Sequence, residues 1–592
     1  MRLRAATLLA LATLLAAAAG GQGAEAPKSF IRVNQVGYLP DAPKVAVVCS
    51  LEPVRIERFE VVDASGRRVL ARPAREDRPF AACASTHRLD FSSLTRPGTY
   101  RIRAGGAASP PVRIGANVYA GGADTLLAYM RQQRSGFNPV FRDSVHERTD
   151  AILVDHPEAG RFIPVTGGWA DAADYLQYVT TSANAAFVML MAYRDHPGAF
   201  PDRHAANGLP GANGIPDVLD EARHGLEWLV RMFPHDSLML NQLGDDRDHS
   251  FPDLPPTDSS DYGWGKGGYR PVYPCTGKPQ GLLRYRNRAN GYASTAGKYA
   301  SAMALGARLL AERDPAFADT LRRRAAAAYE LGRRYPGACQ TAPARAPYFY
   351  EEDNWVDDME LGAAQMHALT GEARYLAEAV MYARQEPVTP WMGADTARHY
   401  QWYPWHNNGH HEVWRQGGAA EKQRMVEYYR QGLERVVARA GNGFRVGIPF
   451  IWCSNNLMAS FATQAYLYRA MTGDNRFREY EQAALDWLFG TNPWGVSMVI
   501  GYPAAGNTPR DPHSILSNQI GVHTQLGGLV DGPVYVTIFR SLQWVRLVQP
   551  DEYAAFNTGD VVYHDDFGDY STNEPIMDGT ANLTYLLAAL AR

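Results

Sequence analysis

Most of the chain has the sequence pattern of amphipathic helices. From about residue 119 onward, apolar residues recur every three or four positions, and at 216–233 Leu219, Ala222 and Leu226 form one such stripe. Helices are predicted near 119–133, 175–195, 216–233, 294–313, 317–335, 357–370, 373–385, 419–440, 455–472, 474–490, 536–548 and 579–591. Because these roughly twelve helices are joined by alternately short and long loops, the pattern favours a barrel of six inner and six outer helices over a bundle.

The longest connections between these helices are rich in Pro, Gly and aromatic residues, and they span 236–292, 339–356, 386–418 and 491–535. In a barrel, such connections can gather at one end. Long ordered loops in a compact domain are usually functional. We therefore expect the functional site where these loops meet.

A different pattern precedes the helices. At 592 residues the chain is too long for one ordinary core, so two domains or one large repeat architecture is expected. From Ser29 to about Ile114, short alternating runs are separated by turns, with a hairpin signal in FEVVDASGRRVL and another strand opening at Pro97-Gly98. This pattern predicts a small β-sandwich at 27–115, followed by a helical domain at 116–592.

Residues 1–26 have the composition of an export signal. Arg2 and Arg4 precede a short apolar stretch that ends in small residues, and no cysteine follows that would carry a lipid. No second apolar run approaches the ~20 residues that a membrane-spanning helix needs. We therefore expect a protein that is secreted or periplasmic.

The cysteines and the charge limit the chemistry further. Five cysteines without a CxxC pair argue against a zinc knuckle, and Cys49 with Cys83 or Cys275 with Cys339 are candidate disulfides in an oxidising compartment. The net charge of −3, without a basic block, argues against nucleic acid or an anionic membrane surface as a partner. Nothing in the sequence predicts an oligomeric state.

Carboxylic acids near both ends of the helical region are the main candidates for catalysis. Asp171 and Asp174 follow a Gly-Gly-Trp turn in GGWADAADY, and their spacing predicts that both lie on one face of a helix's first turn. Glu574 lies in the polar turn STNEP before the last helix. Each motif alone is more often a helix cap. Together they meet the need of glycoside hydrolysis, in which one group protonates the leaving oxygen and another activates water.

Several motifs resemble those of family 9 glycoside hydrolases, the inverting cellulase family. They occur in the family's order over nearly the whole chain after residue 26: IRVNQVGYLP, GGWADAADY, NGIPDVLDEARHGLEWLVRM, NPWGVSMVIG, GGLVDGP and DYSTNEP. The resemblance implies an (α/α)6 barrel preceded by an immunoglobulin-like β-sandwich. It also implies that Glu574 is the general acid and Asp174 the general base, and that Asp171 helps to hold the attacking water.

Substrate contacts are expected from residues beside these motifs. The candidates are Trp169, Tyr175, Trp402, Trp405 and Tyr570, with His513 assisted by Arg510. The family's PHHR loop is reduced here to DPHSIL, and the stretch from Pro533 to Glu574 is longer than usual, consistent with an added helix at 536–548. In DDRDH at 245–249, Asp248 and His249 are expected to be structural rather than catalytic.

A metal site is a further candidate. EEDNWVDDME at 351–360 is similar to a stretch that supplies calcium ligands in the family, which makes Asp357 and Asp358 candidate calcium ligands. The alternative is that they only begin a charged helix. No cofactor is expected for the chemistry itself.

Three functions fit these observations. The first is an inverting endo-β-1,4-glucanase that acts on cellulose or a related β-glucan. The second is an exo-acting enzyme on short β-linked oligosaccharides, including glucosaminides, in which the inserted segment blocks one end of the cleft. The third is a non-catalytic carbohydrate-binding protein on a degenerate barrel. The presence of Asp171, Asp174 and Glu574 together argues against the third, because a binding protein has no use for a spaced acid and base.

Overall fold

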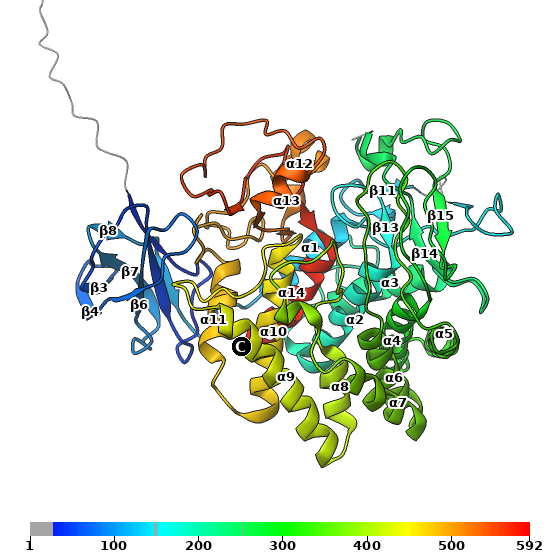
Figure 1. The fold of residues 1–592 in the computed structure, drawn as a ribbon, viewed down its shortest axis with the longest axis horizontal. Helices are drawn as coiled ribbons and strands as arrows, with labels where there is room; N and C mark the ends of the chain where they lie inside the picture. The colour runs from blue at the N-terminus through cyan, green and yellow to red at the C-terminus, as the bar shows by residue number, and fades with distance from the viewer. Residues whose placement is uncertain (1–27, 147–150, 251–252, 592) are drawn as a thin grey trace, which may run out of the picture.

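The computed structural model describes residues 28–146, 151–250 and 253–591. It has a small β-domain at one side and a larger helical domain beside it (Figure 1). The expected export signal at 1–26 lies outside the described residues. No helix in the described ranges has the length and apolar character needed to cross a membrane.

The β-domain is a sandwich of two antiparallel sheets. One sheet has the order β1-β2-β6-β5 and the other the order β4-β3-β7-β8, with β9 also paired to β7. Alternation along β7 puts Tyr100 and Ile102 into the core and Arg101 and Arg103 into solvent, as the sequence pattern predicts. The strand bounds are β1 Ser29–Arg32, β2 Val45–Ser50, β3 Arg58–Asp63, β4 Arg68–Pro73, β5 Arg75–Asp77, β6 Ser85–Asp90, β7 Gly98–Ala104, β8 Ala107–Ala108 and β9 Val112–Ile114.

The helical domain is an (α/α)6 barrel, so the predicted fold class is confirmed. In the described part of the chain, six helices form the inner ring: α2 (Val179–Asp195), α4 (Ala293–Leu310), α6 (Val356–Thr370), α8 (Asn408–Gln416), α10 (Ser454–Thr472) and α14 (Met577–Leu590). Inner helices such as α4 are buried almost all round, because they have neighbours on every side. The ring closes where α14 packs against α2.

The outer helices bury only one stripe each. They are α1 (Gly122–Gln132), α3 (Asp217–Met232), α5 (Pro315–Arg334), α7 (Ala373–Gln385), α9 (Ala419–Arg439) and α11 (Arg478–Leu488). Each packs on an inner helix, as α3 does on α2 and α5 on α4. On α5 the buried residues Leu321, Ala325 and Ala328 recur at helical spacing, whereas most of its other side chains face solvent.

The structure differs from the predicted helices in four main places. The helix expected at 175–195 begins only at Val179, because the residues before it form a loop and a short strand. The helix expected at 536–548 is α13 (Val536–Ser541), which ends after less than two turns. Two helices were not predicted, α8 and the short α12 (Ile515–Gln519).

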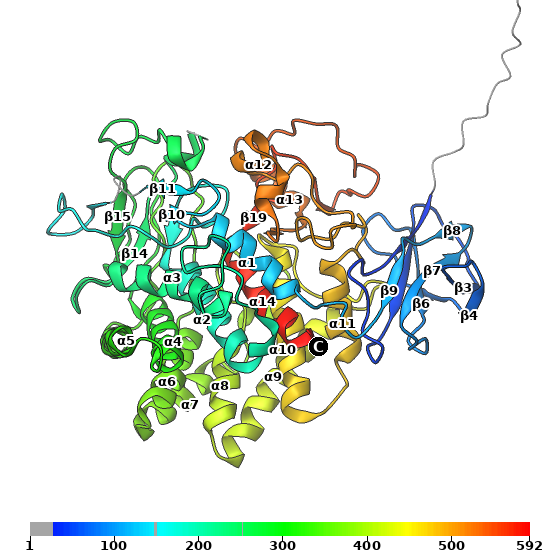
Figure 2. The same cartoon turned by 180° about the vertical axis from the view of Figure 1, so that it is seen from behind.

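The long connections gather at one end of the barrel, as expected from their lengths. The strands β10–β15 and the helices α12 and α13 rise above the same ends of the helices (Figures 1 and 2). The strands are β10 Gly136–Asn138, β11 Asp143–Val145, β12 Ile152–Leu153, β13 Gln177–Tyr178, β14 Leu240–Leu243, β15 Pro271–Pro274, β16 Leu529–Val530, β17 Val534–Tyr535, β18 Val561–Val562 and β19 Pro575–Ile576.

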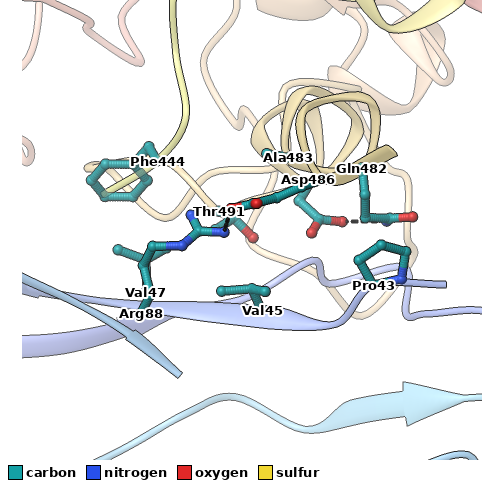
Figure 3. A pocket seen from close by; sticks show the side chains of 10 residues that line it. Pro43, Val45, Val47, Arg88, Phe444, Gln482, Ala483, Asp486 and Thr491 are labelled. Atoms are coloured by element: carbon teal, nitrogen blue, oxygen red, sulfur yellow. Dashed lines mark hydrogen bonds and ion pairs between the residues drawn. The ribbon is translucent and has the colours of Figure 1, made fainter. Parts of the chain in front are cut away.

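Polar contacts join the sandwich to the barrel. Figure 3 shows Arg88 extending from the strands of the sandwich toward the helical domain. Its guanidinium donates to the Gly443 carbonyl at 2.7 Å and pairs with Glu479 at 2.8 Å. Nearby, the Asn34 side-chain amide donates to Asp486 of α11 at 2.8 Å. Because these groups are buried or partly buried, the contacts hold the two domains in one arrangement.

Both candidate disulfides are present. Cys49 is joined to Cys83 within the sandwich, and Cys275 is joined to Cys339 between two long connections of the barrel. The remaining cysteine, Cys453, is buried and has a free thiol.

The Cys275–Cys339 bond closes a loop with a sequence separation of 64 residues. Its removal by the double substitution Cys275→Ser and Cys339→Ser is expected to lower the free energy of unfolding by about 2–4 kcal/mol, because the unfolded chain regains loop entropy. Thermal unfolding of the variant and the unmodified protein, with and without reductant, measures this. An unchanged Tm in the variant would show that the bond does not stabilise the fold.

Candidate active site

A cavity of about 520 Å³ lies at the end of the barrel where the long connections gather. Five carboxylic acids line it: Asp171, Asp174, Asp248, Asp531 and Glu574. Aromatic rings form much of the remaining wall, including those of Tyr175, Tyr178, Tyr348, Tyr350, Tyr400, Trp452, Trp544, Phe567 and Tyr570. The three predicted catalytic carboxylates are therefore brought together in one cavity.

Asp171 and Asp174 lie in a loop, so the prediction that they share the first turn of a helix is wrong. Asp174 Oδ1 accepts a hydrogen bond from the backbone N–H of Leu176 at 3.0 Å, which holds a tight turn instead of a helical one. The following residues form β13, where Tyr178 pairs with Gln242 of β14. The pairing with β14 delays the helix until Val179.

The Asp171 side chain is 4% exposed and has two hydroxyl donors. Thr181 of α2 donates to Oδ1 at 2.5 Å, and the Tyr350 hydroxyl donates to Oδ2. Burial, together with the charges of Asp578 and Asp174, raises the pKa of Asp171 well above its ordinary value. Both oxygens are thus fixed by protein groups at the floor of the cavity.

Asp174 is less buried and faces His249. Its Oδ2 lies 3.3 Å from His249 Nε2, and the same ring lies 3.6 Å from Asp248. Burial disfavours the charged ring, but the hydrogen bond to Asp174 and the charges of Asp248 and Asp174 outweigh it and raise the pKa of His249 to about 10. His249 is therefore an imidazolium at neutral pH, in direct contact with the proposed base.

The contact between Asp174 and His249 follows from the strand pairing. β14 leads into the DDRDH turn, so the β13–β14 pair places that turn beside the loop that carries Asp171 and Asp174. The backbone N–H of Tyr175 also donates to Asp248 Oδ2 at 3.0 Å. Asp248 and His249, expected to be structural, thus line the cavity and contact this loop directly.

Glu574, which comes from near the C-terminal end of the sequence, contacts the same loop. Its Oε1 accepts a hydrogen bond from the backbone N–H of Ala173 at 3.0 Å. Burial, reinforced by the charge of Asp174, raises the pKa of Glu574 well above its ordinary value. The backbone N–H of Met577 donates to the Asp171 carbonyl at 2.9 Å, which ties the start of α14 to the same loop.

Asp531, from the GGLVDGP motif, was not among the predicted site residues. β16 pairs with β19, so the backbone N–H of Asp531 donates to the Glu574 carbonyl at 2.9 Å. Its carboxyl is 2% exposed and lies 3.2 Å from the Cys453 thiol. Burial and the neighbouring Glu574 raise the pKa of Asp531. The motif that contains Asp531 was identified in the sequence. However, a single aspartate after an apolar run can equally be a turn residue, so the sequence did not mark it as part of the site.

Three of the predicted substrate-binding residues line the cavity, namely Tyr175, His513 and Tyr570. The His513 ring lies against Phe567, with 5.4 Å between ring centroids, and its Nδ1 is 2.5 Å from the Phe567 carbonyl. Burial lowers the pKa of His513, which keeps the ring neutral.

The other predicted substrate-binding residues do not line the cavity. Trp169 is fully buried, and its indole N–H donates to Glu221 at 2.8 Å, so it anchors α3. Trp405 is 1% exposed in the barrel core, and Trp402 packs against that core. Arg510 is exposed, and its backbone N–H donates to Asp565. None of these four side chains faces the cavity, because the three tryptophans pack in or against the core and Arg510 is exposed to solvent.

Two cavity residues lie in the segment that was predicted to be helical. Trp544 and Arg546 follow the end of α13 and line the cavity. Trp452 and Tyr348 form an aromatic wall with Tyr570; the rings of Trp452 and Tyr570 are stacked at 20° with centroids 6.1 Å apart. The prediction of one helix over 536–548 gave no reason to expect that Trp544 and Arg546 line a cavity.

The residues proposed as calcium ligands do not fit a calcium site. The Lys298 ammonium of α4 donates to Asp358 Oδ2 at 2.6 Å and also pairs with Glu352. Asp357 Oδ1 accepts from the Asn354 amide at 2.9 Å. A buried ammonium already supplies the positive charge that these acids need. Among the described residues, no group of three or more His, Cys, Asp or Glu side chains is arranged to hold a metal ion.

Comparison with known proteins agrees with this geometry. The model of glycosyl hydrolase family 9 matches residues 119–587, and that of the cellulase N-terminal ig-like domain matches residues 26–109. A solved metagenome-derived glycoside hydrolase family 9 endoglucanase is 28% identical, with a TM-score of 0.74 over 95% of this chain and 99% of its own.

Two curated relatives are similar over most of this chain. Endoglucanase C of Cellulomonas fimi is 28% identical over 95% of this chain, which spans about half (52%) of that relative's length. The xyloglucan-specific endo-beta-1,4-glucanase BoGH9A of Bacteroides ovatus is 26% identical, with 86% of each chain covered. The family match covers most of the chain and includes all three predicted catalytic carboxylates. The chain therefore belongs to glycosyl hydrolase family 9, with a cellulase-type immunoglobulin-like domain before its catalytic barrel.

Proposed function

We propose that the protein hydrolyses β-1,4-linked glucans with inversion at the anomeric carbon, as an endoglucanase-type enzyme. Glu574 is the general acid, Asp174 is the general base, and Asp171 helps to hold the attacking water. One observation carries the proposal: carboxylic acids from the first and last parts of the barrel's sequence line one cavity, where Glu574 is hydrogen-bonded to the loop that carries both aspartates. In this reaction the acid protonates the leaving oxygen while the base activates water on the opposite face of the sugar.

The different surroundings of the two groups support their assignment. A general acid must hold its proton at rest, and the raised pKa of Glu574 meets this need. A general base must be accessible to water, and Asp174 lines the cavity and is less buried than Asp171, with its Oδ2 3.3 Å from His249 Nε2. Asp171 is less suited to be the base, because Thr181 and Tyr350 already occupy its oxygens. The chemistry uses carboxyl groups and water and needs no cofactor.

The substrate class rests on the relatives and on the cavity. The relatives named above are an endoglucanase and a xyloglucan-specific endo-beta-1,4-glucanase, which favours a β-glucan as the partner of this chain as well. The aromatic wall offers flat apolar faces on which sugar rings can stack. We also propose that the protein is secreted or periplasmic, because the residues at 1–26 read as an export signal and two disulfides need an oxidising compartment. We retain 27–115 and 116–592 as the proposed domain limits.

Glu574→Gln is expected to lower kcat on an unactivated β-glucan by about 10²- to 10⁴-fold, because the leaving oxygen loses its proton donor. The loss should be much smaller for an aryl glycoside whose leaving group needs no proton. Initial rates on both substrates measure the difference, with exposed Glu372→Gln as the matched control. Near-normal turnover of the glucan by Glu574→Gln would remove this residue from the mechanism.

Asp174→Asn is expected to reduce kcat more than Asp171→Asn does, because only Asp174 is proposed to take the proton from water. Steady-state rates of the two variants on one soluble β-glucan give the comparison, and Tm values show whether either amide disturbs the loop. The roles would have to be exchanged if Asp171→Asn were the slower enzyme at unchanged Tm.

His249→Gln is expected to shift the basic limb of the kcat/KM profile to higher pH, by about one pH unit. With a pKa of about 10, His249 is charged at neutral pH, and its positive charge lowers the pKa of the proposed acid, Glu574. Glutamine carries no charge, so Glu574 keeps its proton to a higher pH in the variant. His367→Gln on α6, whose ring is hydrogen-bonded to Gln416, serves as the control. A basic limb that does not move would mean that His249 has no influence on the acid.

A further inference from the structure

The segment 542–549, here called the strap, follows α13, contributes Trp544, Arg546 and Val548 to the lining of the cavity, and is held at both ends. At one end, the Tyr348 hydroxyl accepts from the backbone N–H of Gln543, and the Tyr570 hydroxyl donates to the Gln543 carbonyl, each at 2.7 Å. At the other end, the backbone N–H groups of Val548 and Gln549 donate to the Asp566 carboxylate at 2.9 and 2.7 Å. The strap is thus an ordered part of the site.

The strap also packs closely on the turn that leads to Glu574. A Cβ atom at Gly568 would lie 1.8 Å from the Arg546 carbonyl oxygen, so this approach requires glycine. The Gly568 N–H donates to Asp566 at 2.6 Å, which links the turn to the anchor of the strap. Within the strap, Trp544 has a φ of 65°, a conformation that is costly for a bulky residue and that surrounding contacts must maintain.

Two side chains of the strap, those of Trp544 and Arg546, line the cavity, and in the described part of the chain neither makes a hydrogen bond that would hold it there. Trp544 lines the cavity and is 70% exposed. Arg546 also lines it and is exposed, and within the described ranges its guanidinium has no hydrogen bond or ion pair. An exposed indole and an unpaired guanidinium on a fixed segment, beside a cavity, are typical of a surface that binds a ligand.

We propose that Trp544 and Arg546 form a sugar-binding subsite that receives a glucose unit of the substrate remote from the bond that is cleaved. The indole stacks on the sugar ring, and the guanidinium donates to two of its hydroxyl groups. The inference rests on the proposed function for its substrate class. We place the subsite at the open side of the cavity, away from the buried carboxylates, because Trp544 is 70% exposed whereas Asp171 is 4% exposed.

The substrate class proposed above, a β-glucan, is neutral. Arg546 is therefore assigned to hydroxyl groups, to which its planar N–H groups can donate in pairs. The strap then makes the enzyme sensitive to chain length, because a short oligosaccharide that fills the floor does not reach Trp544.

Kinetics on cello-oligosaccharides of increasing length test this proposal. Trp544→Ala and Arg546→Gln are each expected to raise KM for cellopentaose about tenfold, the factor for one lost stacking contact or charge-assisted hydrogen bond at a partly open site. The KM of the same two variants for cellotriose should change less than about twofold. Trp544→Phe, which keeps an aromatic face, should restore most of the affinity for cellopentaose. The matched controls are exposed residues that do not line the cavity, Trp264→Ala and Arg540→Ala.

Binding of cellopentaose to Glu574→Gln, measured by calorimetry with and without Trp544→Ala, separates the subsite from the chemistry. Weaker binding in the double variant supports the subsite even if the unmodified enzyme hydrolyses no cello-oligosaccharide, a result that would overturn the proposed function alone. If the enzyme cleaves cellopentaose, but the strap variants leave KM and binding unchanged or weaken cellotriose equally, the subsite proposal is wrong.

Discussion

The closure of the helical ring places the proposed catalytic groups together. α2 follows the loop of Asp171 and Asp174, and α14 follows Glu574, so the contact between α2 and α14 brings residues about four hundred positions apart into one cavity. A chain of buried amides supports this contact. Asn184 of α2 donates to Asn582 of α14 at 2.8 Å, and Asn582 donates to Asn456 of α10 at 2.7 Å. Each buried amide has a hydrogen-bond partner in the next helix, so polar contacts as well as apolar packing fix how the ring closes.

The same closure sets the electrostatics of the site. Several acids share a cavity from which water is partly excluded, and such groups cannot all be ionised. The structure separates them by their partners. Asp174 has the His249 imidazolium, Asp171 has two hydroxyl donors, and Glu574 has a single backbone N–H. These different partners, more than the identity of the side chains, distinguish the proposed general acid from the proposed general base.

The sequence predicted the elements whose stability is local. The helix expected at 373–385 is observed at Ala373–Gln385, and the one expected at 216–233 at Asp217–Met232, because one apolar stripe defines each. The helix expected at 536–548 stops at Ser541, because Tyr348 and Asp566, far away in the sequence, bind the backbone that follows. Likewise, Trp169 and Trp405 lie beside motifs but point into the core, and a sequence alone does not say which way a ring points. His249 was underestimated because its contact with Asp174 depends on the pairing of β13 with β14.

In the proposed mechanism, a water molecule activated by Asp174 attacks the sugar directly while Glu574 protonates the leaving oxygen. The most direct measurement is proton NMR of the anomer that forms first during hydrolysis of a soluble β-1,4-glucan oligosaccharide, before mutarotation. Attack by water on the face opposite the leaving group predicts that the α-anomer appears first. First formation of the β-anomer would mean retention through a covalent glycosyl-enzyme intermediate and would contradict the account.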